Sequence, residues 1–313
     1  MNEAQKFRRL ALRVKVVRWL VTVVIVIVVV LVGAIGGYGW TQHQAAKESD
    51  ELTQYMSGLS TVMSPNIETS DQYLADTNFM GGKVTSHRYK DIEGYRESWS
   101  PLVEPYSWSW LGTQSATMTL NATDTTDTGA YDRLTQHKVP LFYNPRVKHP
   151  DVRRVTDVTK VAATKGAVAE VALTFKHPLT YAQIQRRLPR KLHAVWYWIG
   201  TGAKADPTMM DNTFMGVQAN SKGHLQQGKY THPYRDFRQA AKQLQKMTWD
   251  AQYDGFSPAK YLKSYVTRYP TQKTAKFAGV IVTGNSENFQ PLTQADWLYA
   301  SSAGFFQART AIK

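Results

Sequence analysis

The strongest pattern along the chain is a long apolar run near the N-terminus. Residues from Trp19 to Tyr38 include no charged side chain and are mostly Val, Ile and Leu. A helix rises about 1.5 Å per residue, so this run spans about 30 Å, the thickness of a bilayer core. Because a backbone in lipid must satisfy its own hydrogen bonds, we expect a membrane-spanning helix over residues 19–40. Trp19, Tyr38 and Trp40 at its ends are typical of the headgroup zone.

The residues before this run are strongly basic. Residues 1–18 have a net charge of +5, from Glu3 and six basic residues: Lys6, Arg8, Arg9, Arg13, Lys15 and Arg18. Positive flanks stay in the cytoplasm, so these six residues set the topology. We expect residues 1–18 to be a cytoplasmic stub and residues 41–313 to lie outside the cell membrane. A cleaved signal peptide is the competing interpretation, but the apolar run is long for one and no clean small-residue cleavage site follows it.

The stub also carries an apolar stripe at helical spacing. Most of the basic residues lie elsewhere on the helical wheel from the stripe residues, which are Phe7, Leu10, Ala11, Val14 and Val17. Two interpretations stay open from these residues. The stub is an amphipathic helix that binds a cytoplasmic partner, or it is a basic flank that sets topology and touches anionic lipid. The charge alone favours the second.

The outer region is expected to form two units. In the first, residues 41–155, apolar residues at helical spacing predict a helix over residues 46–63 that ends before Pro65. Residues 81–95 are expected to form a glycine turn and a strand. Three glycines are expected to loosen the join between the membrane helix and the next one: Gly36, Gly37 and Gly39.

The second unit, residues 156–313, begins with clear strand patterns. Residues 167–175 alternate, with Glu170 and Thr174 on the face opposite the apolar side chains, which predicts a half-buried strand. Residues 193–199 are apolar on both faces, which is typical of a central strand. A further strand is predicted over residues 277–284.

Helices are predicted between and after these strands. Thr180 and Gln183 form a capping box for a short helix. An apolar stripe predicts another helix over residues 234–249, and Ser257 with Pro258 begins the next one. Thr293 with Asp296 is expected to cap a last helix. Because strands and helices mix without a strict βαβ repeat, the fold class is α+β extracytoplasmic domains after a single transmembrane helix.

Composition and motifs mainly exclude chemistry. The 313 residues include no Cys, which excludes disulfides, thiolate metal sites and Cys nucleophiles. The eight His show no metal-binding spacing. Ser257–Lys260 matches the S-x-x-K motif of penicillin-binding enzymes but lacks that family's other motifs, so a helix cap is the better interpretation. The sequence predicts no enzyme, no cofactor and no metal site.

The net charge of +14 has to be judged against the predicted topology. An outer domain cannot reach DNA, so we expect no direct contact with nucleic acid. Its positive field either attracts an anionic envelope ligand, such as a wall polymer, or only keeps the domain soluble. Most Trp residues are expected in the core. Trp108 and Trp110, which share one face of a predicted strand, are the candidate outer binding surface.

Separated segments of the chain carry a family resemblance. They are Gly82–Gly94, Val168–Phe175, Leu179–Gln185, Val195–Ile199, Gly279–Phe289 and Asp296–Gly304. In this order they are similar to the sigma factor regulator family, the membrane-bound anti-sigma factors of Gram-positive bacteria. The resemblance covers most of residues 5–110 and 160–313. It implies a single-pass protein that holds an extracytoplasmic-function sigma factor at the membrane until an envelope stress signal modulates or releases it.

Two functions therefore stand against each other. In the first, the outer domain is a sensor and the stub contacts a sigma factor, directly or through a small membrane co-regulator. In the second, the chain is a membrane-anchored envelope-binding module, for a wall polymer or a peptide ligand, without a signalling role.

Overall fold

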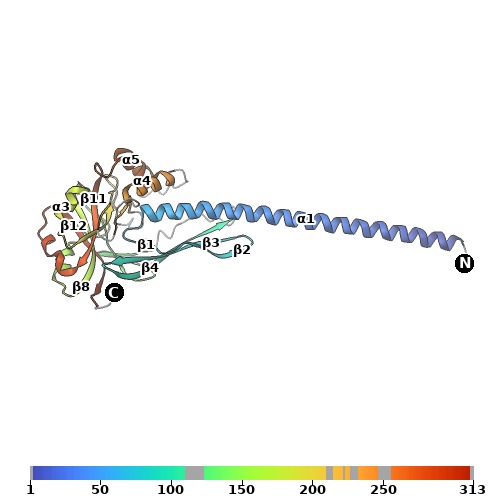
Figure 1. Cartoon of the computed structure of the whole chain (residues 1–313), viewed down its shortest axis with the longest axis horizontal. Coiled ribbons are helices and arrows are strands. Elements are labelled where there is room, and N and C mark those ends of the chain that lie inside the picture. Colours follow the sequence, from blue (N-terminus) through green and yellow to red (C-terminus); the bar gives the residue numbers. More distant parts are fainter. Residues whose placement is uncertain are drawn as a thin grey trace.

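The computed structural model describes residues 3–109, 123–208, 214–220, 223–225, 232–245 and 255–310. One long helix leads into a body of mixed helices and antiparallel sheets, which confirms the predicted α+β class. Figure 1 shows this helix extending from the body, with the N-terminus at its far end.

Helix α1 (Glu3–Val62) has 60 residues and is apolar enough near its N-terminus to span a membrane. It ends before Pro65, as predicted. The two helices expected on either side of three glycines are one, because α1 continues through all of them: Gly36, Gly37 and Gly39. Membrane helices tolerate glycine, since in lipid only intrahelical hydrogen bonds satisfy the backbone.

The first sheet lies beside the part of α1 that is nearer the body (Figure 1). Its strands are β1 (Glu68–Thr69), β2 (Tyr73–Asn78), β3 (Gly81–Ile92) and β4 (Tyr95–Ser107). Strand β3 pairs with β4 on one edge and with β1 and β2 on the other, always antiparallel. A small three-stranded sheet follows, with β5 (Thr123–Thr126), β6 (Gly129–Asp132) and β7 (Lys138–Val139).

The largest sheet has the antiparallel order β10–β9–β11–β8–β12. Its strands are β8 (Ala167–Thr180), β9 (His193–Trp198), β10 (Gly216–Gln218), β11 (Lys276–Asn285) and β12 (Leu298–Ala308). Strand β9 is central, as predicted. Strand β8 is not half-buried, because Glu170 and Thr174 are both fully buried. Other segments cover its polar face: Tyr143 donates its backbone N–H to the Thr174 hydroxyl, and Lys90 meets Glu170.

The remaining helices are α2 (Val158–Ala163), α3 (Tyr181–Arg187), α4 (Pro233–Leu244), α5 (Pro258–Arg268) and the 3₁₀ helix η2 (Ser286–Leu292). The capping box of Thr180 and Gln183 is confirmed. Ser257 caps α5 as predicted, accepting the Lys260 backbone N–H at 3.3 Å. The predicted helix after Thr293 is wrong. Strand β12 begins at Leu298 instead, because the free edge of β8 offers it a ladder of backbone hydrogen bonds.

Apolar side chains cover the large sheet on both faces. One face packs against α3, α4 and α5, and this core also contains Leu59 and Val62 of α1. The other face packs a second cluster that includes Trp99, Phe142, Trp196 and Trp198. The second cluster draws residues from both sides of residue 155, and the division of the outer region at that position stays a prediction.

Candidate functional site

The apolar stripe predicted in the stub lies on α1. Four of its residues line a shallow recess together with Lys15 and Arg18, namely Phe7, Leu10, Ala11 and Val14. Val17 is exposed on the same helix and does not line the recess. The six basic residues named above are exposed as well. A helical backbone therefore presents the stripe and the charges together, and both are open to a partner or a lipid surface.

The C-terminal part of α1 packs against the first sheet. Ala45 and Met56 of α1 form a buried cluster with Val84, Leu102 and Tyr106 of β3 and β4. Val84 lies opposite Glu104 in the β3–β4 ladder, so the alternating side chains of this pair face the helix. Further along, α1 enters the main core. A helix long enough to cross a membrane thus ends inside the packed body.

This helix-facing side of the sheet buries the carboxyl group of Glu104. Glu104 is buried, and its Oε1 has no hydrogen-bond partner among the described residues. The Ser86 hydroxyl, on the same side of the ladder, is also buried and unpaired there. Burial disfavours the charged form of an acid and raises the pKa of Glu104 to about 7. The contact between α1 and the sheet therefore contains a group that titrates near neutral pH.

A second buried carboxyl group is fully paired. Lys90 of β3 approaches the two oxygens of Glu170 on β8 at 3.0 and 2.8 Å. Asn66, just after α1, donates to Glu170 Oε1 at 2.8 Å, and the Phe305 backbone N–H donates to Oε2 at 3.3 Å. The Lys90 ammonium also lies 4.2 Å from the centre of the Trp99 ring. We call these five residues the Lys90–Glu170 node.

The electrostatics of the node depend on the hydrogen bonds that both oxygens of Glu170 accept. Burial lowers the pKa of Lys90, because a buried ammonium loses its hydration, and the Glu170 carboxylate opposes that shift. An ion pair out of water is stable only when geometry and extra hydrogen bonds compensate for desolvation. The node supplies this geometry and these hydrogen bonds. It joins the segment just after α1, the first sheet and the large sheet at one point.

The candidate outer surface is only partly described. Trp108 follows β4 and contacts two other aromatic rings, Phe79 and Trp40 of α1, each with centroids 6.2 Å apart. Trp110 lies outside the described residues. Trp108 is therefore placed beside the helix, near the end of the predicted membrane span.

A polar cleft of about 340 Å³ opens where the β3–β4 turn meets the large sheet. Ten residues line it: Asn66, Glu68, Asp91, Glu93, Gly94, His193, Val195, Gln218, Asn220 and Thr283. Glu93 holds its edge, accepting from Thr283 at 2.7 Å and lying 2.8 Å from His193 Nδ1. Among the described residues, the lining has three carboxylates and no Lys or Arg. This cleft does not suit the expected anionic envelope ligand.

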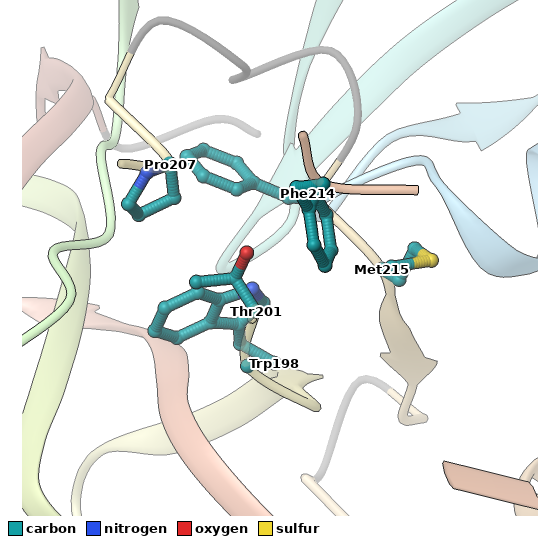
Figure 2. Close-up of a pocket in the computed structure, with 7 residues that line it drawn as sticks. Trp198, Thr201, Pro207, Phe214 and Met215 are labelled. Carbon is teal, nitrogen blue, oxygen red and sulfur yellow. The ribbon is translucent and has the colours of Figure 1, made fainter. Parts of the chain in front are cut away.

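A second recess is too small for a ligand. Figure 2 shows Trp198, Thr201, Pro207, Phe214 and Met215 around it. Its volume of about 10 Å³ has room for about one water molecule. The Trp198 and Phe214 rings pack edge to face with centroids 6.1 Å apart, so this is core packing.

Sequence patterns missed Lys90, Glu104 and Glu170. Strand alternation marks Glu170 as solvent-facing, and no local signal pairs it with a lysine 80 positions away. For Glu104, the alternation with Leu102 and Tyr106 does hold a signal, because it places a carboxyl group among apolar side chains on one face.

Comparisons with known proteins give two family matches. A family model described as Sigma factor regulator N-terminal matches residues 8–97, and one described as Sigma factor regulator C-terminal matches residues 162–304. The first match includes most of α1 and Lys90, and the second includes Glu170. Neither a curated protein nor a solved structure matches the chain.

Proposed function

We propose, from the premise that this chain belongs to the sigma factor regulator family, that it is a single-pass membrane anti-sigma factor whose outer domain senses the state of the envelope. The family is regulatory and implies interaction with a sigma factor. Our proposal adds the topology, the contact surface and the route between the two sides of the membrane.

The observation that carries the proposal is the continuity of α1. One helix holds the stub, the apolar run of membrane length and a segment packed into the body. A helix without a break transmits rotation, tilt or axial shift along its length, since its backbone hydrogen bonds form one ladder. A change in how Leu59 or Met56 packs in the body would therefore move the stub.

The orientation follows from the charges that flank the membrane run. Six basic residues precede it, and the ten residues after Trp40 hold one basic and two acidic residues. The positive-inside rule then favours an N-terminus in the cytoplasm and a body outside. This arrangement puts the stub on the side where a sigma factor works.

The stub stripe is our proposed contact for the sigma factor or for a small membrane co-regulator. Leu10 and Val14 stand on one side of the helix among exposed apolar neighbours. A short peptide normally loses binding energy to ordering when it folds on a partner. Continuity with a long helix supports a helical stub before binding, which reduces that cost.

The signal would enter through the body. The Lys90–Glu170 node fixes the first sheet to the large sheet, and the first sheet grips α1. An envelope ligand or stress that shifts the sheets therefore shifts the seat of α1. In this proposal the node is the fixed joint, and the contact between α1 and the first sheet is the part that adjusts.

The test compares two matched pairs of substitutions in the stub. Leu10→Asp with Val14→Asp puts two charges into the stripe, whereas Leu12→Asp with Val16→Asp makes the same changes on the other side of the helix. The readouts are transcripts of each sigma regulon and the sigma factor that co-purifies with the full chain from detergent. We expect the first pair to lose the sigma factor and derepress one regulon, as deletion of the chain does, while the second pair keeps both near wild type.

The alternative envelope-binding module predicts a different result. Both pairs would leave every sigma regulon unchanged, and so would deletion of the chain. Removal of residues 2–16 would then remove no co-purifying sigma factor. That combined result would refute the regulatory proposal and leave the outer domain as an anchored binding module.

A further inference from the structure

The tip of the β2–β3 hairpin is apolar and exposed. Phe79 and Met80, between the two strands, have exposed fractions of 54% and 45%. Exposed apolar side chains that gather in one place mark an interaction surface. Tyr38 and Trp40 of α1 are exposed to a similar degree and continue this patch.

Ring contacts hold the hairpin tip against α1. The Phe79 ring stacks on Tyr38 with centroids 6.0 Å apart and an interplanar angle of 18°. Trp108 bridges the two elements, because it contacts Phe79 and Trp40 edge to face. Figure 1 shows the sheet reaching along α1 toward the N-terminus. The tip therefore lies at the same level of the helix as Tyr38 and Trp40.

That level is the predicted outer surface of the bilayer. The run that begins at Trp19 needs about 20 residues to cross a core of about 30 Å, which brings the helix to Tyr38 and Trp40. No charged residue lies between Asp76 and Lys83. These two form an exposed ion pair at 2.8 Å across the hairpin, a few residues from its tip. The hairpin therefore has no charged side chain in the segment that is expected to reach the membrane surface.

Both carbonyl groups and one N–H group of the tip residues Phe79 and Met80 are hydrogen-bonded within the protein. The Trp108 indole N–H donates to Phe79 O at 3.1 Å, and the Ser107 hydroxyl donates to Met80 O at 2.7 Å. The Met80 N–H donates to the Asn78 side chain at 2.8 Å. Unpaired peptide groups are costly near hydrocarbon, and a loop with paired groups can enter that zone. A tip facing only water needs no such arrangement.

We propose that the β2–β3 tip docks into the headgroup zone of the outer leaflet of the membrane that α1 spans. Phe79 and Met80 insert beside Tyr38, Trp40 and Trp108, and together they form an aromatic belt contributed by a helix and a hairpin. The occupant is lipid, because the patch is continuous with the membrane helix. The dock gives the body a second attachment point, which sets its height and the tilt of α1. This inference goes beyond the proposed function and rests only on α1 crossing the membrane.

The experiment uses the natural absence of cysteine. Full-length Met80→Cys and Ser98→Cys variants are labelled with a polarity-sensitive fluorophore and reconstituted into phosphatidylglycerol and phosphatidylethanolamine vesicles. Ser98 is an exposed β4 residue opposite Tyr89 of β3. It lies toward the far end of β3, about 25 Å from the β2–β3 tip at the usual rise of a strand. Nitroxide-bearing lipids in matched vesicles serve as quenchers.

We expect the label at position 80 to emit at shorter wavelength and to lose fluorescence to nitroxides near the headgroups. The label at position 98 should report water and stay unquenched. These results should not change with the ratio of lipid to protein, which separates lipid contact from contact with a second copy. Equal, water-like emission at both positions, or quenching that disappears on dilution with lipid, would overturn the proposal.

A second comparison tests the chemistry of insertion. Phe79→Ser in the Met80→Cys background should shift the label toward water and reduce quenching, while Phe79→Leu should preserve both signals. Circular dichroism of each variant checks that the fold is retained. Quenching that is the same in the Ser and Leu variants would contradict apolar insertion. Neither measurement involves a sigma factor, so failure here leaves the regulatory proposal intact.

Discussion

Two buried carboxyl groups, Glu170 and Glu104, are held in opposite ways. Glu170 lies in the joint between the two sheets and is paired on both oxygens by Lys90, by Asn66 and by a backbone N–H. Glu104 lies in the contact between the first sheet and α1, and its Oε1 has no partner among the described residues. The surroundings of Glu170 stabilise its ionised form, whereas those of Glu104 disfavour its ionised form.

The difference separates a fixed joint from an adjustable one. A fully paired buried charge keeps its neighbours in one arrangement. If any partner moves away, the charge stays buried without the interaction that compensates for its lost hydration. A buried carboxyl group with an unpaired oxygen destabilises the fold less while it is protonated than when it is ionised. The node therefore holds the two sheets together, whereas ionisation of Glu104 would disfavour the packing of α1 against the first sheet.

The largest expected effect comes from breaking the node. Lys90→Met leaves Glu170 buried without its cation, and loss of one partner of a buried pair costs about 3–5 kcal/mol. The measurement is the free energy of unfolding of the full chain in detergent, from urea titration. Lys90→Met combined with Glu170→Leu should recover part of the loss, because no buried charge remains. The recovery is incomplete because Asn66 and the Phe305 N–H lose their acceptor.

The control for this prediction is an exposed pair on the same strand. Lys83 binds Asp76 at 2.8 Å in solvent, so Lys83→Met should cost no more than about 1 kcal/mol. Equal losses for the two Met variants would show that Glu170 tolerates isolation, and the contrast between the two carboxyl groups would disappear.

The next effect concerns Glu104 and depends on pH. Its folded-state pKa is raised from 4.5 to about 7. A raised pKa means that the folded state favours the protonated form, so the stability is present below the unfolded pKa and is lost as pH rises to 7 and beyond. Glu104→Gln removes this loss. We expect the variant to match wild type at pH 4.5 and to be more stable at pH 8, by about 1–3 kcal/mol.

The check is the free energy of unfolding of both proteins across that pH range. Asp71 is the control, because its pKa is shifted in the opposite direction. Hydrogen bonds with His87 lower the pKa of Asp71, and its carboxylate is exposed. Asp71→Asn should therefore produce no gain at high pH. A Glu104→Gln variant that is no more stable than wild type at pH 8 would mean that the Glu104 carboxylate is well accommodated.

The sequence predicts the elements better than it predicts what joins them. The capping box at Thr180 and the cap at Ser257 are local, because each involves residues three positions apart, and both are confirmed. The strand at β9 follows from its apolar faces. The helix expected after Thr293 fails because β12 gains its hydrogen bonds from β8, which no nearby residue announces.

The same limit applies to the candidate site. The stub stripe and the membrane run are local patterns within one helix. Helical spacing predicts the stripe, and an uninterrupted apolar segment predicts the membrane run. The Lys90–Glu170 node joins positions 80 apart, and strand alternation points Glu170 the wrong way because it assumes solvent on one face. Glu104 is intermediate: its place in the alternation was available in the sequence, but its isolation depends on α1 covering it.

The smallest expected effect extends the contrast from carboxyl groups to hydroxyl groups. Ser86 is buried on the side of the first sheet that faces α1 and has no partner among the described residues, whereas Ser100 donates to the buried Asp132 at 2.6 Å. Removing a hydroxyl group bonded to a charged partner costs about 1.5–3 kcal/mol, whereas removing an unpaired one costs almost nothing. Ser100→Ala should therefore destabilise the full chain, while Ser86→Ala should change its free energy of unfolding by less than about 0.5 kcal/mol. A large loss in Ser86→Ala would reveal a hidden partner on the side of the sheet that faces α1. The adjustable joint would then be as well paired as the fixed one.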